Sequence, residues 1–271
     1  MTRRTLMAVL AHPDDEATTI GGTLALYAAR GVRTVLVTCT NGEFGDRPYG
    51  RRPDPDHDTR AAAAARLAEL HRSCEHLSVD TVELLGYHDS GTVEWEQPYL
   101  STLFRGVPVE RVAGDIGRLL EQHRPQVVLT HEPDSTRHPD HRHAAQATAL
   151  AVESTSIAAK LYYSAHGTRY WRRVYEALAD NGFHRPTPDP DRVKLTDRID
   201  RAITTTIDVG SVLDRKRQAV YAHTDQLADS TAAKVPENQW ATVFAEEDYI
   251  RIHDTTAAPT PETDLFAGIT D

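Results

Sequence analysis

Short apolar runs alternate with longer helical patterns along the first half of the chain. Residues 5–11 form a continuous apolar run of the kind found in a buried parallel strand. Residues 19–30 then predict a helix that ends at Gly31, and the β-branched run 32–38 predicts a second strand. Together, these three segments predict a right-handed βαβ unit.

The same alternation continues toward the middle of the chain. It predicts helices over residues 59–76, 109–123 and 138–155, and strands over residues 82–85, 127–130 and 161–163. Strands that alternate with helices are typical of an α/β fold. We therefore expect a Rossmann-like, mostly parallel sheet with helices on both faces and the active site at the carboxyl ends of its strands.

The pattern is weaker in the last third. Residues 181–198 are rich in Pro, Asp and Arg and are expected to form an irregular loop or insertion. A strand over 202–209, a helix over 211–223 with Ser211 as its N-cap, and a strand over 249–252 follow. We expect one α/β domain over residues 1–254 and a poorly ordered polar tail over 255–271.

Composition limits the classes of partner. Forty acidic against thirty basic residues give a net charge of −10, which disfavours nucleic acid and anionic membrane surfaces and favours a small-molecule substrate. Arg169, Arg172 and Arg173 form a local basic cluster that is either solvated surface or a contact for an anionic group. Two cysteines and a short N-terminal apolar stretch predict a reduced, cytoplasmic protein, and nothing in the sequence predicts its oligomeric state.

An imidazole and three carboxylates follow the first predicted strand, in the segment from His12 to Glu16. This turn has none of the glycines that a dinucleotide site needs, and its side chains would attract a cation. A catalytic zinc site uses three protein ligands and an open position, so a further ligand is required. The fourth predicted strand ends near His131, His138 and His141, and we choose His141 as the third ligand.

Each motif also has a purely structural explanation. A lone histidine is more often a core or surface residue than a ligand, and acids after a strand can simply favour the positive end of the next helix. Two such motifs at the ends of two parallel strands make metal binding the better interpretation.

Ala-His-Pro-Asp-Asp-Glu at residues 11–16, followed by His-Pro-Asp-His at 138–141, resembles the LmbE-like (PIG-L) family of zinc-dependent de-N-acetylases. The resemblance implies that His12, Asp15 and His141 are zinc ligands. It also implies that Asp14 is the general base and that His138 assists the intermediate or protonates the leaving amine. This assignment agrees with the chemistry of a metal-activated water that attacks an amide carbonyl.

Two positions depart from the family pattern. Some family members have Tyr where this chain has Thr136, and the downstream motif from Ala222 to Gln226 contains Asp225 where Ser or Thr is common. Glu43, Asp89 and Arg60 are further candidates for substrate binding, although Arg60 could equally cover helix surface.

We therefore expect hydrolysis of an N-acetyl group from an amino sugar or its conjugate. Cleavage of a larger acyl conjugate and a non-catalytic sugar-binding role are the alternatives. Zinc is the expected metal, and Fe(II), Co(II) and Mn(II) suit the same ligand types.

Overall fold

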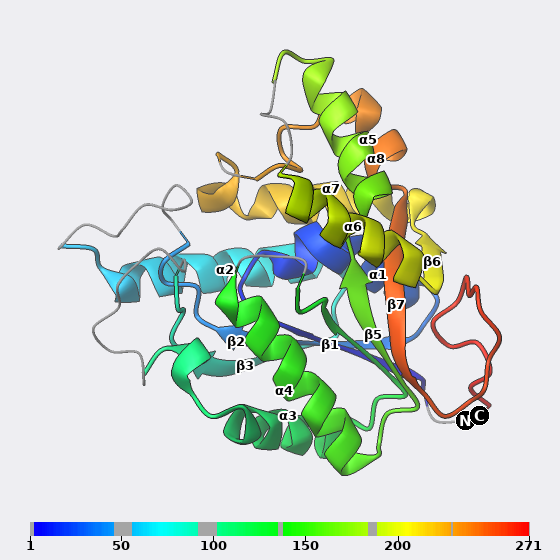
Figure 1. Cartoon of the computed structure of the whole chain (residues 1–271). Helices are drawn as coiled ribbons and strands as arrows, with labels where there is room; N and C mark the ends of the chain where they lie inside the picture. The colour runs from blue at the N-terminus through cyan, green and yellow to red at the C-terminus, as the bar shows by residue number, and fades with distance from the viewer. Residues whose placement is uncertain are drawn as a thin grey trace.

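A seven-stranded mixed sheet forms the centre of the molecule (Figure 1). The computed structural model describes residues 3–45, 56–91, 102–134, 138–183, 189–228 and 230–270. The strands are β1 (Thr5–Leu10), β2 (Arg33–Thr40), β3 (Thr81–Tyr87), β4 (Val127–His131), β5 (Lys160–Ala165), β6 (Thr205–Asp208) and β7 (Glu246–Asp254). Their spatial order is β3-β2-β1-β4-β5-β7-β6. The first five strands in this order are parallel, and β7 runs antiparallel to both β5 and β6.

Helices cover both faces of this sheet, as the sequence predicted. They are α1 (Asp15–Ala29), α2 (Thr59–Leu77), α3 (Val109–His123), α4 (Pro139–Thr155), α5 (Thr168–Ala179), α6 (Pro190–Ala202), α7 (Leu213–Ala222) and α8 (Trp240–Phe244). Helices α1, α2 and α7 pack together on one face, and α3 packs with α4 on the other (Figure 1). The expected fold class is therefore confirmed.

Strand β1 shows why two layers of helices are needed. Because successive side chains of a strand point to opposite faces, Leu6, Ala8 and Leu10 join the core beneath α1 and α2. Met7, Val9 and Ala11 join the core beneath α3 and α4. A strand buried on both faces must be apolar throughout, which explains the uninterrupted run seen in the sequence.

The structure departs from the expected elements between β5 and β6. Helix α5 was not predicted, and α6 occupies much of the segment expected to be irregular. The Asp189 carboxylate caps α6 by accepting a hydrogen bond from the Asp191 amide at 3.0 Å, and Pro190 suits the first turn. The residues before β6 therefore continue a helix, and composition rich in Pro and Asp was a misleading indicator. Ser211 lies in a short 3₁₀ turn and does not cap α7, which begins at Leu213.

The C-terminal residues also differ from the expected poorly ordered tail. Leu265 is fully buried and Phe266 is 3% exposed. Tyr27 Oη donates to Asp264 at 2.7 Å and accepts from the Leu265 amide at 2.7 Å. The buried side chains of Leu265 and Phe266 thus anchor a segment whose average composition is polar. None of the helices in the described residues is long and apolar enough to cross a membrane.

Candidate metal centre and active site

The carboxyl ends of β1 and β4 lie side by side, although about 120 residues separate them. The two strands pair in parallel, with Leu6 opposite Val127 and Ala8 opposite Leu129. The chain continues from β1 into α1 on one face of the sheet and from β4 toward α4 on the other. This is the topological switch point at which open α/β sheets bind ligands. The two histidine-containing motifs therefore meet there.

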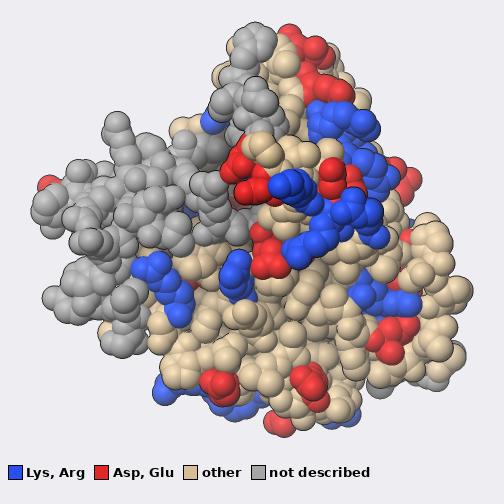
Figure 2. Space-filling model, in the orientation of Figure 1, with Lys and Arg blue, Asp and Glu red and all other residues tan. Residues whose placement is uncertain are grey.

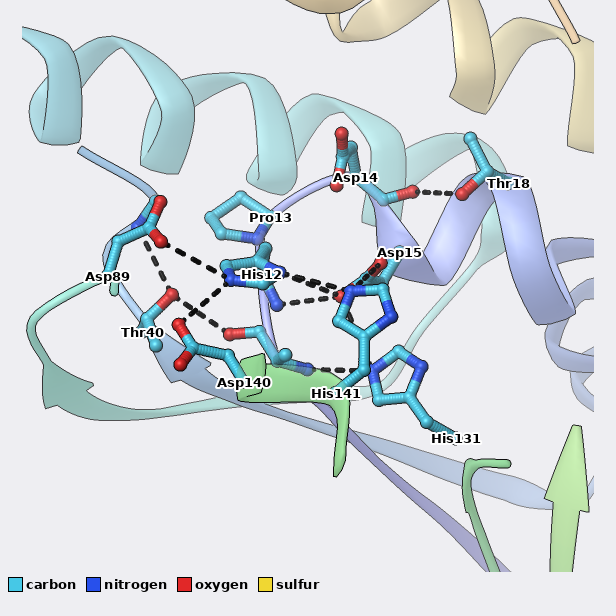
Figure 3. Close-up of polar contacts among 12 residues, drawn as sticks. His12, Pro13, Asp14, Asp15, Thr18, Thr40, Asp89, His131, Asp140 and His141 are labelled. Atoms are coloured by element: carbon cyan, nitrogen blue, oxygen red, sulfur yellow. Dashed lines mark hydrogen bonds and ion pairs between the residues drawn. The ribbon is translucent and has the colours of Figure 1, made fainter. Parts of the chain in front are cut away.

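Donor atoms of three side chains lie close together at this point (Figure 3). His12 Nδ1 lies 3.3 Å from His141 Nε2. The two oxygens of Asp15 each face one of these nitrogens: Oδ2 lies 3.5 Å from His12 Nδ1 and Oδ1 lies 3.3 Å from His141 Nε2. Ligands about 2.0–2.2 Å from a tetrahedral ion are separated by about 3.3–3.6 Å, so these spacings are compatible with a zinc site in which another position is left for water.

The other ring nitrogen of His12 faces carboxylates. Its Nε2 lies 3.2 Å from Asp140 Oδ2 and 3.5 Å from Asp89 Oδ1, on the opposite side of the ring from His141 (Figure 3). The Ser90 amide donates to Asp140 Oδ2 at 2.9 Å, so this fully buried carboxylate is itself held in place. Carboxylates in this position fix the tautomer and orientation of a metal-binding histidine. Asp140 was missed from the sequence, although its place inside the second motif was a usable signal.

Two further histidines have different surroundings. His131 Nε2 accepts a hydrogen bond from the Ala11 amide at 3.0 Å, and its ring stacks on His141 at 4.0 Å. Burial, together with His141, lowers the pKa of His131 to about 4, which is consistent with this acceptor role. His131 Nε2 also lies 3.4 Å from Asp15 Oδ2, so this ring contacts the Asp15 carboxylate as well as stacking on His141. His138 lies against the other two rings, 4.3 Å from His12 and 5.1 Å from His141.

The turn between β1 and α1 places Asp14 beside the candidate ligands in a strained conformation. Its φ of 117° lies in a region that non-glycine residues rarely adopt. The Asp14 amide donates to Glu16 Oε2 at 2.9 Å, and the His12 amide donates to Asp15 Oδ2 at 2.8 Å. Burial raises the pKa of the Asp14 carboxyl, against the opposing attraction of Arg66. A carboxylate with a raised pKa is suited to accept a proton.

Arg66, from α2, contacts the turn between β1 and α1. Its guanidinium donates to the carbonyls of Pro13 and Gly42 and lies 3.4 Å from Asp14 Oδ1. Arg66 is 2% exposed, whereas the sequence-predicted Arg60 lies exposed in the first turn of the same helix, α2. Of these two arginines, Arg66 is therefore the one that contacts the site, and its position within an alanine-rich helix had concealed this role.

A cavity of about 310 Å³ opens next to Asp14, Asp15 and His141. Its lining also includes His166, Tyr170, Trp171, His223 and Gln226. This volume is near the lower end of the range, about 300–1,000 Å³, that small-molecule sites occupy. The candidate metal ligands therefore face a space that suits a small substrate.

The acidic candidates for substrate binding lie deeper than expected. Asp89 is 3% exposed and accepts from the Gly91 amide at 2.8 Å as well as facing His12. Glu43 is also 3% exposed, and its Oε1 pairs with His88 Nδ1 at 2.7 Å. The structure thus brings Asp89 to His12, a candidate metal ligand, and places Glu43 beside His88.

The part of the chain that carries the candidate ligands matches a known protein family. The family model described as GlcNAc-PI de-N-acetylase matches residues 7–152, which include both histidine motifs. The chain belongs to this family. The 1D-myo-inositol 2-acetamido-2-deoxy-alpha-D-glucopyranoside deacetylase of Acidothermus cellulolyticus is 36% identical over 98% of this chain and 95% of its own length.

Other proteins that this chain resembles carry different names. The mycothiol S-conjugate amidase of Streptomyces coelicolor is 30% identical over 98% of this chain and 97% of its own. The crystal structure of Dbv21, the A40926 pseudoaglycone deacetylase, aligns with a TM-score of 0.59 at 18% identity and covers 93% of this chain and 98% of that one. Deacetylases and amidases are amide hydrolases, so this family member is an enzyme of that class.

The downstream motif of the family reaches the same cavity in this chain. His223 Nε2 lies 2.6 Å from Glu16 Oε1, and both side chains are almost fully buried. Burial acts to lower the pKa of His223, but the Glu16 carboxylate raises it above its ordinary value overall. This ion pair joins α7 to the turn that carries Asp14. Thr136, where some family members have Tyr, lies outside the described residues.

Proposed function

We propose that this chain is a zinc-dependent hydrolase that removes an N-acetyl group from an amino sugar or an amino-sugar conjugate. In this proposal, His12, Asp15 and His141 bind the metal, Asp14 is the general base and His138 acts on the leaving group. The observation that carries the proposal is the approach of the His12 and His141 nitrogens and the Asp15 carboxylate to 3.3–3.5 Å of one another, with Asp14 in the adjacent turn.

Each protein group has a separate part in the reaction. Zinc, when bound, supplies a water of lowered pKa and polarises the acetyl carbonyl. Asp14 accepts a proton from the attacking water, and its raised pKa favours that step. His138 lies beside His12 and His141, where it can stabilise the developing charge or donate a proton to the amine nitrogen. Acetate and a free amine are the products.

The residues that surround the ligands support the same reaction. We infer that Asp89 acts mainly through the His12 ring, because it is buried and lies 3.5 Å from Nε2. Glu43 stays a candidate for contact with substrate hydroxyls, and Arg60 stays a candidate for an anionic group because it is exposed at the start of α2. The ligand types do not select zinc alone, since Fe(II), Co(II) and Mn(II) also bind to histidine and carboxylate.

A larger amide is the second candidate substrate. The 30% identity to a mycothiol S-conjugate amidase favours it, because a bulky acyl group can be cleaved by the same metal chemistry. A non-catalytic sugar-binding protein would have no chemical need for Asp14 in a strained turn beside three potential ligands. Catalysis is therefore the better-supported role.

The test compares two variants that separate metal binding from proton transfer. Zinc content and release of primary amine from a panel of N-acetylated amino sugars and conjugates are measured for Asp14→Asn and His12→Ala. Asp14→Asn should retain zinc and lose turnover by about 10²- to 10⁴-fold, because only the base is removed. His12→Ala should lose zinc. Full activity in Asp14→Asn, or stoichiometric zinc in His12→Ala, would contradict the assigned roles.

A further inference from the structure

A row of aromatic rings leads away from the metal centre along α5. His166 stacks on Tyr170 with ring centroids 4.2 Å apart, Tyr170 meets Trp171 edge-on at 5.2 Å, and Trp171 stacks on Tyr175 at 5.7 Å. His166 and Tyr170 line the catalytic cavity. The row therefore begins inside that cavity and ends outside it.

A second hollow lies at the outer end of this row, between α5 and α6. This α5–α6 groove has a volume of about 280 Å³ and is lined by Thr168, Trp171, Arg172, Tyr175, Glu176, Arg192, Val193 and Thr196. Trp171 lines both hollows, so one side chain connects them. A molecule that reaches past Trp171 can occupy the two spaces together.

Positive charge accompanies the aromatic surface of the groove. The Arg192 guanidinium lies 5.4 Å from the centroid of the Trp171 ring. Figure 2 shows Lys and Arg side chains gathered over α5 and α6, with acidic side chains among them. Within the groove itself, Arg172 and Arg192 outnumber Glu176. An aromatic ligand that carries a negative charge complements this lining.

The basic cluster seen in the sequence divides accordingly. Arg173 pairs with Glu246 at 2.8 Å, and Arg169 lies 3.6 Å from Asp248 and 3.8 Å from Asp200. These two arginines hold α5 to neighbouring elements. Arg172, the third member, lines the groove. One of the three basic residues is thus placed for ligand contact.

We propose that the α5–α6 groove binds the aglycone of the amino-sugar substrate, as an aromatic ring with an anionic substituent. The proposal rests on the proposed function, because the acetamide must lie at the metal end of the catalytic cavity. The opposite end of the same molecule then points toward Trp171 and the groove. The substrate class is accordingly an aryl-type conjugate of an N-acetylated amino sugar, larger than a free monosaccharide.

The test compares two substrates that differ only in the aglycone. The KM values of the zinc-loaded enzyme are measured for the methyl and 4-carboxyphenyl glycosides of N-acetylglucosamine, both of the same anomer. The wild-type KM should be about tenfold lower for the carboxyphenyl glycoside, the size expected for one stacking and one charge contact. Arg192→Glu should bring the two KM values together.

Lys194→Glu is the matched control. It makes the same charge change two residues further along α6, at an exposed side chain that pairs with Asp191 and does not line the groove. This variant should keep the wild-type ratio of KM values. Equal KM values in the wild type, or equal loss of the ratio in both variants, would overturn the proposal.

Two further outcomes distinguish the groove from the reaction itself. An N-(4-carboxybenzoyl) amide of glucosamine tests whether the groove serves the acyl side instead. If Arg192 lowers the KM for this amide but not for the carboxyphenyl glycoside, the groove binds the acyl group and the aglycone assignment is wrong. If neither glycoside is hydrolysed, the proposed function fails. Binding of the carboxyphenyl glycoside is then measured by calorimetry. Binding that is lost in Arg192→Glu and kept in Lys194→Glu supports the groove independently of catalysis. Absence of binding to the wild type rejects the groove.

Discussion

The carboxylate of Asp140 lies 3.2 Å from Nε2 of His12, while Nδ1 of the same ring faces His141 and Asp15. Asp140 and His141 are neighbours in the sequence, yet they act on opposite sides of one imidazole. The first turn of α4 thus supplies both a proposed metal ligand and the group that orients another ligand. If His12 binds the proposed metal, this arrangement makes the site depend on a residue on the other side of the His12 ring.

Asp140→Asn should therefore weaken zinc binding by about 10- to 100-fold, because the orienting carboxylate of a metal-binding histidine loses its charge. The nearly identical shape of Asn keeps the packing around Ser90. Competition with a chromophoric chelator measures the change in affinity. Asp134→Asn serves as the control, because Asp134 is a partly exposed acid that precedes α4 and pairs with Arg142 and Arg198; this variant should bind zinc as the wild type does.

Zinc binding should weaken as the pH falls. Burial disfavours the imidazolium of His12, but the carboxylates of Asp89, Asp140 and Asp15 favour it more and hold the pKa of His12 well above its ordinary value in the metal-free protein. A metal ligand must be neutral, so protons compete with zinc below that raised pKa. Calorimetric titrations in buffers of different ionisation enthalpy should detect proton release at neutral pH. Affinity that does not change between pH 6 and 8 would argue against His12 as a ligand.

Arg66→Met should destabilise the protein by about 2–3 kcal/mol, since it removes the Arg66 donors to the buried carbonyls of Pro13 and Gly42 and the charged partner of Asp14. The Gly42 carbonyl keeps its hydrogen bond from the Gly45 amide, so the Pro13 carbonyl is the one affected most. Denaturant unfolding measures the loss. Arg60→Met is the matched control on the same helix, and its exposed position predicts a change within about 0.5 kcal/mol. Equal losses in the two variants would show that Arg66 has no special role in holding the turn.

The buried pair Glu247 and Lys216 should make stability depend on pH. Burial alone would raise the pKa of Glu247, but the Lys216 ammonium 2.7 Å away and the hydrogen bond from the Thr23 amide lower it overall. A lowered folded-state pKa contributes stability above the unfolded value, about 4.3, and loses it as the pH falls through the folded value.

Glu247→Gln isolates this contribution. At pH 7 it should cost about 3–5 kcal/mol, because it leaves Lys216 buried without a counter-charge. The difference from the wild type should shrink at pH 3, because this pH lies below the unfolded-state pKa and the stability that the lowered folded-state pKa contributes is being lost there. Unfolding free energies of both proteins at the two pH values provide the measurement. A difference that stays constant with pH would contradict the lowered pKa.

Local patterns predicted much of this fold. Helix α3 has the predicted bounds, and strands β1, β2 and β4 lie within two residues of theirs, because apolar runs and helical periodicity reflect burial over short windows. Helix α5 has the same kind of amphipathic pattern, with Val174, Ala177 and Leu178 buried on one face, and the prediction missed it. The pattern of α6 is weaker, because only Thr196 and Ile199 are buried in a helix that is largely polar. The C-terminal segment likewise has few buried apolar side chains, Leu265 and Phe266 among them, within a polar composition.

The sequence by itself determined the chemistry of the candidate site: an imidazole and carboxylates after one strand, and a second imidazole cluster after another. Those motifs are local, and their residue types are sufficient to indicate a metal. Only the tertiary structure decided that β1 lies next to β4, which brings His12 Nδ1 to 3.3 Å from His141 Nε2 across 129 positions. It also selected Arg66 rather than Arg60, and it assigned Asp140 to the His12 ring. Sequence spacing carries no information on such pairings, because they depend on which strands share an edge and which side chains the packed helices bury.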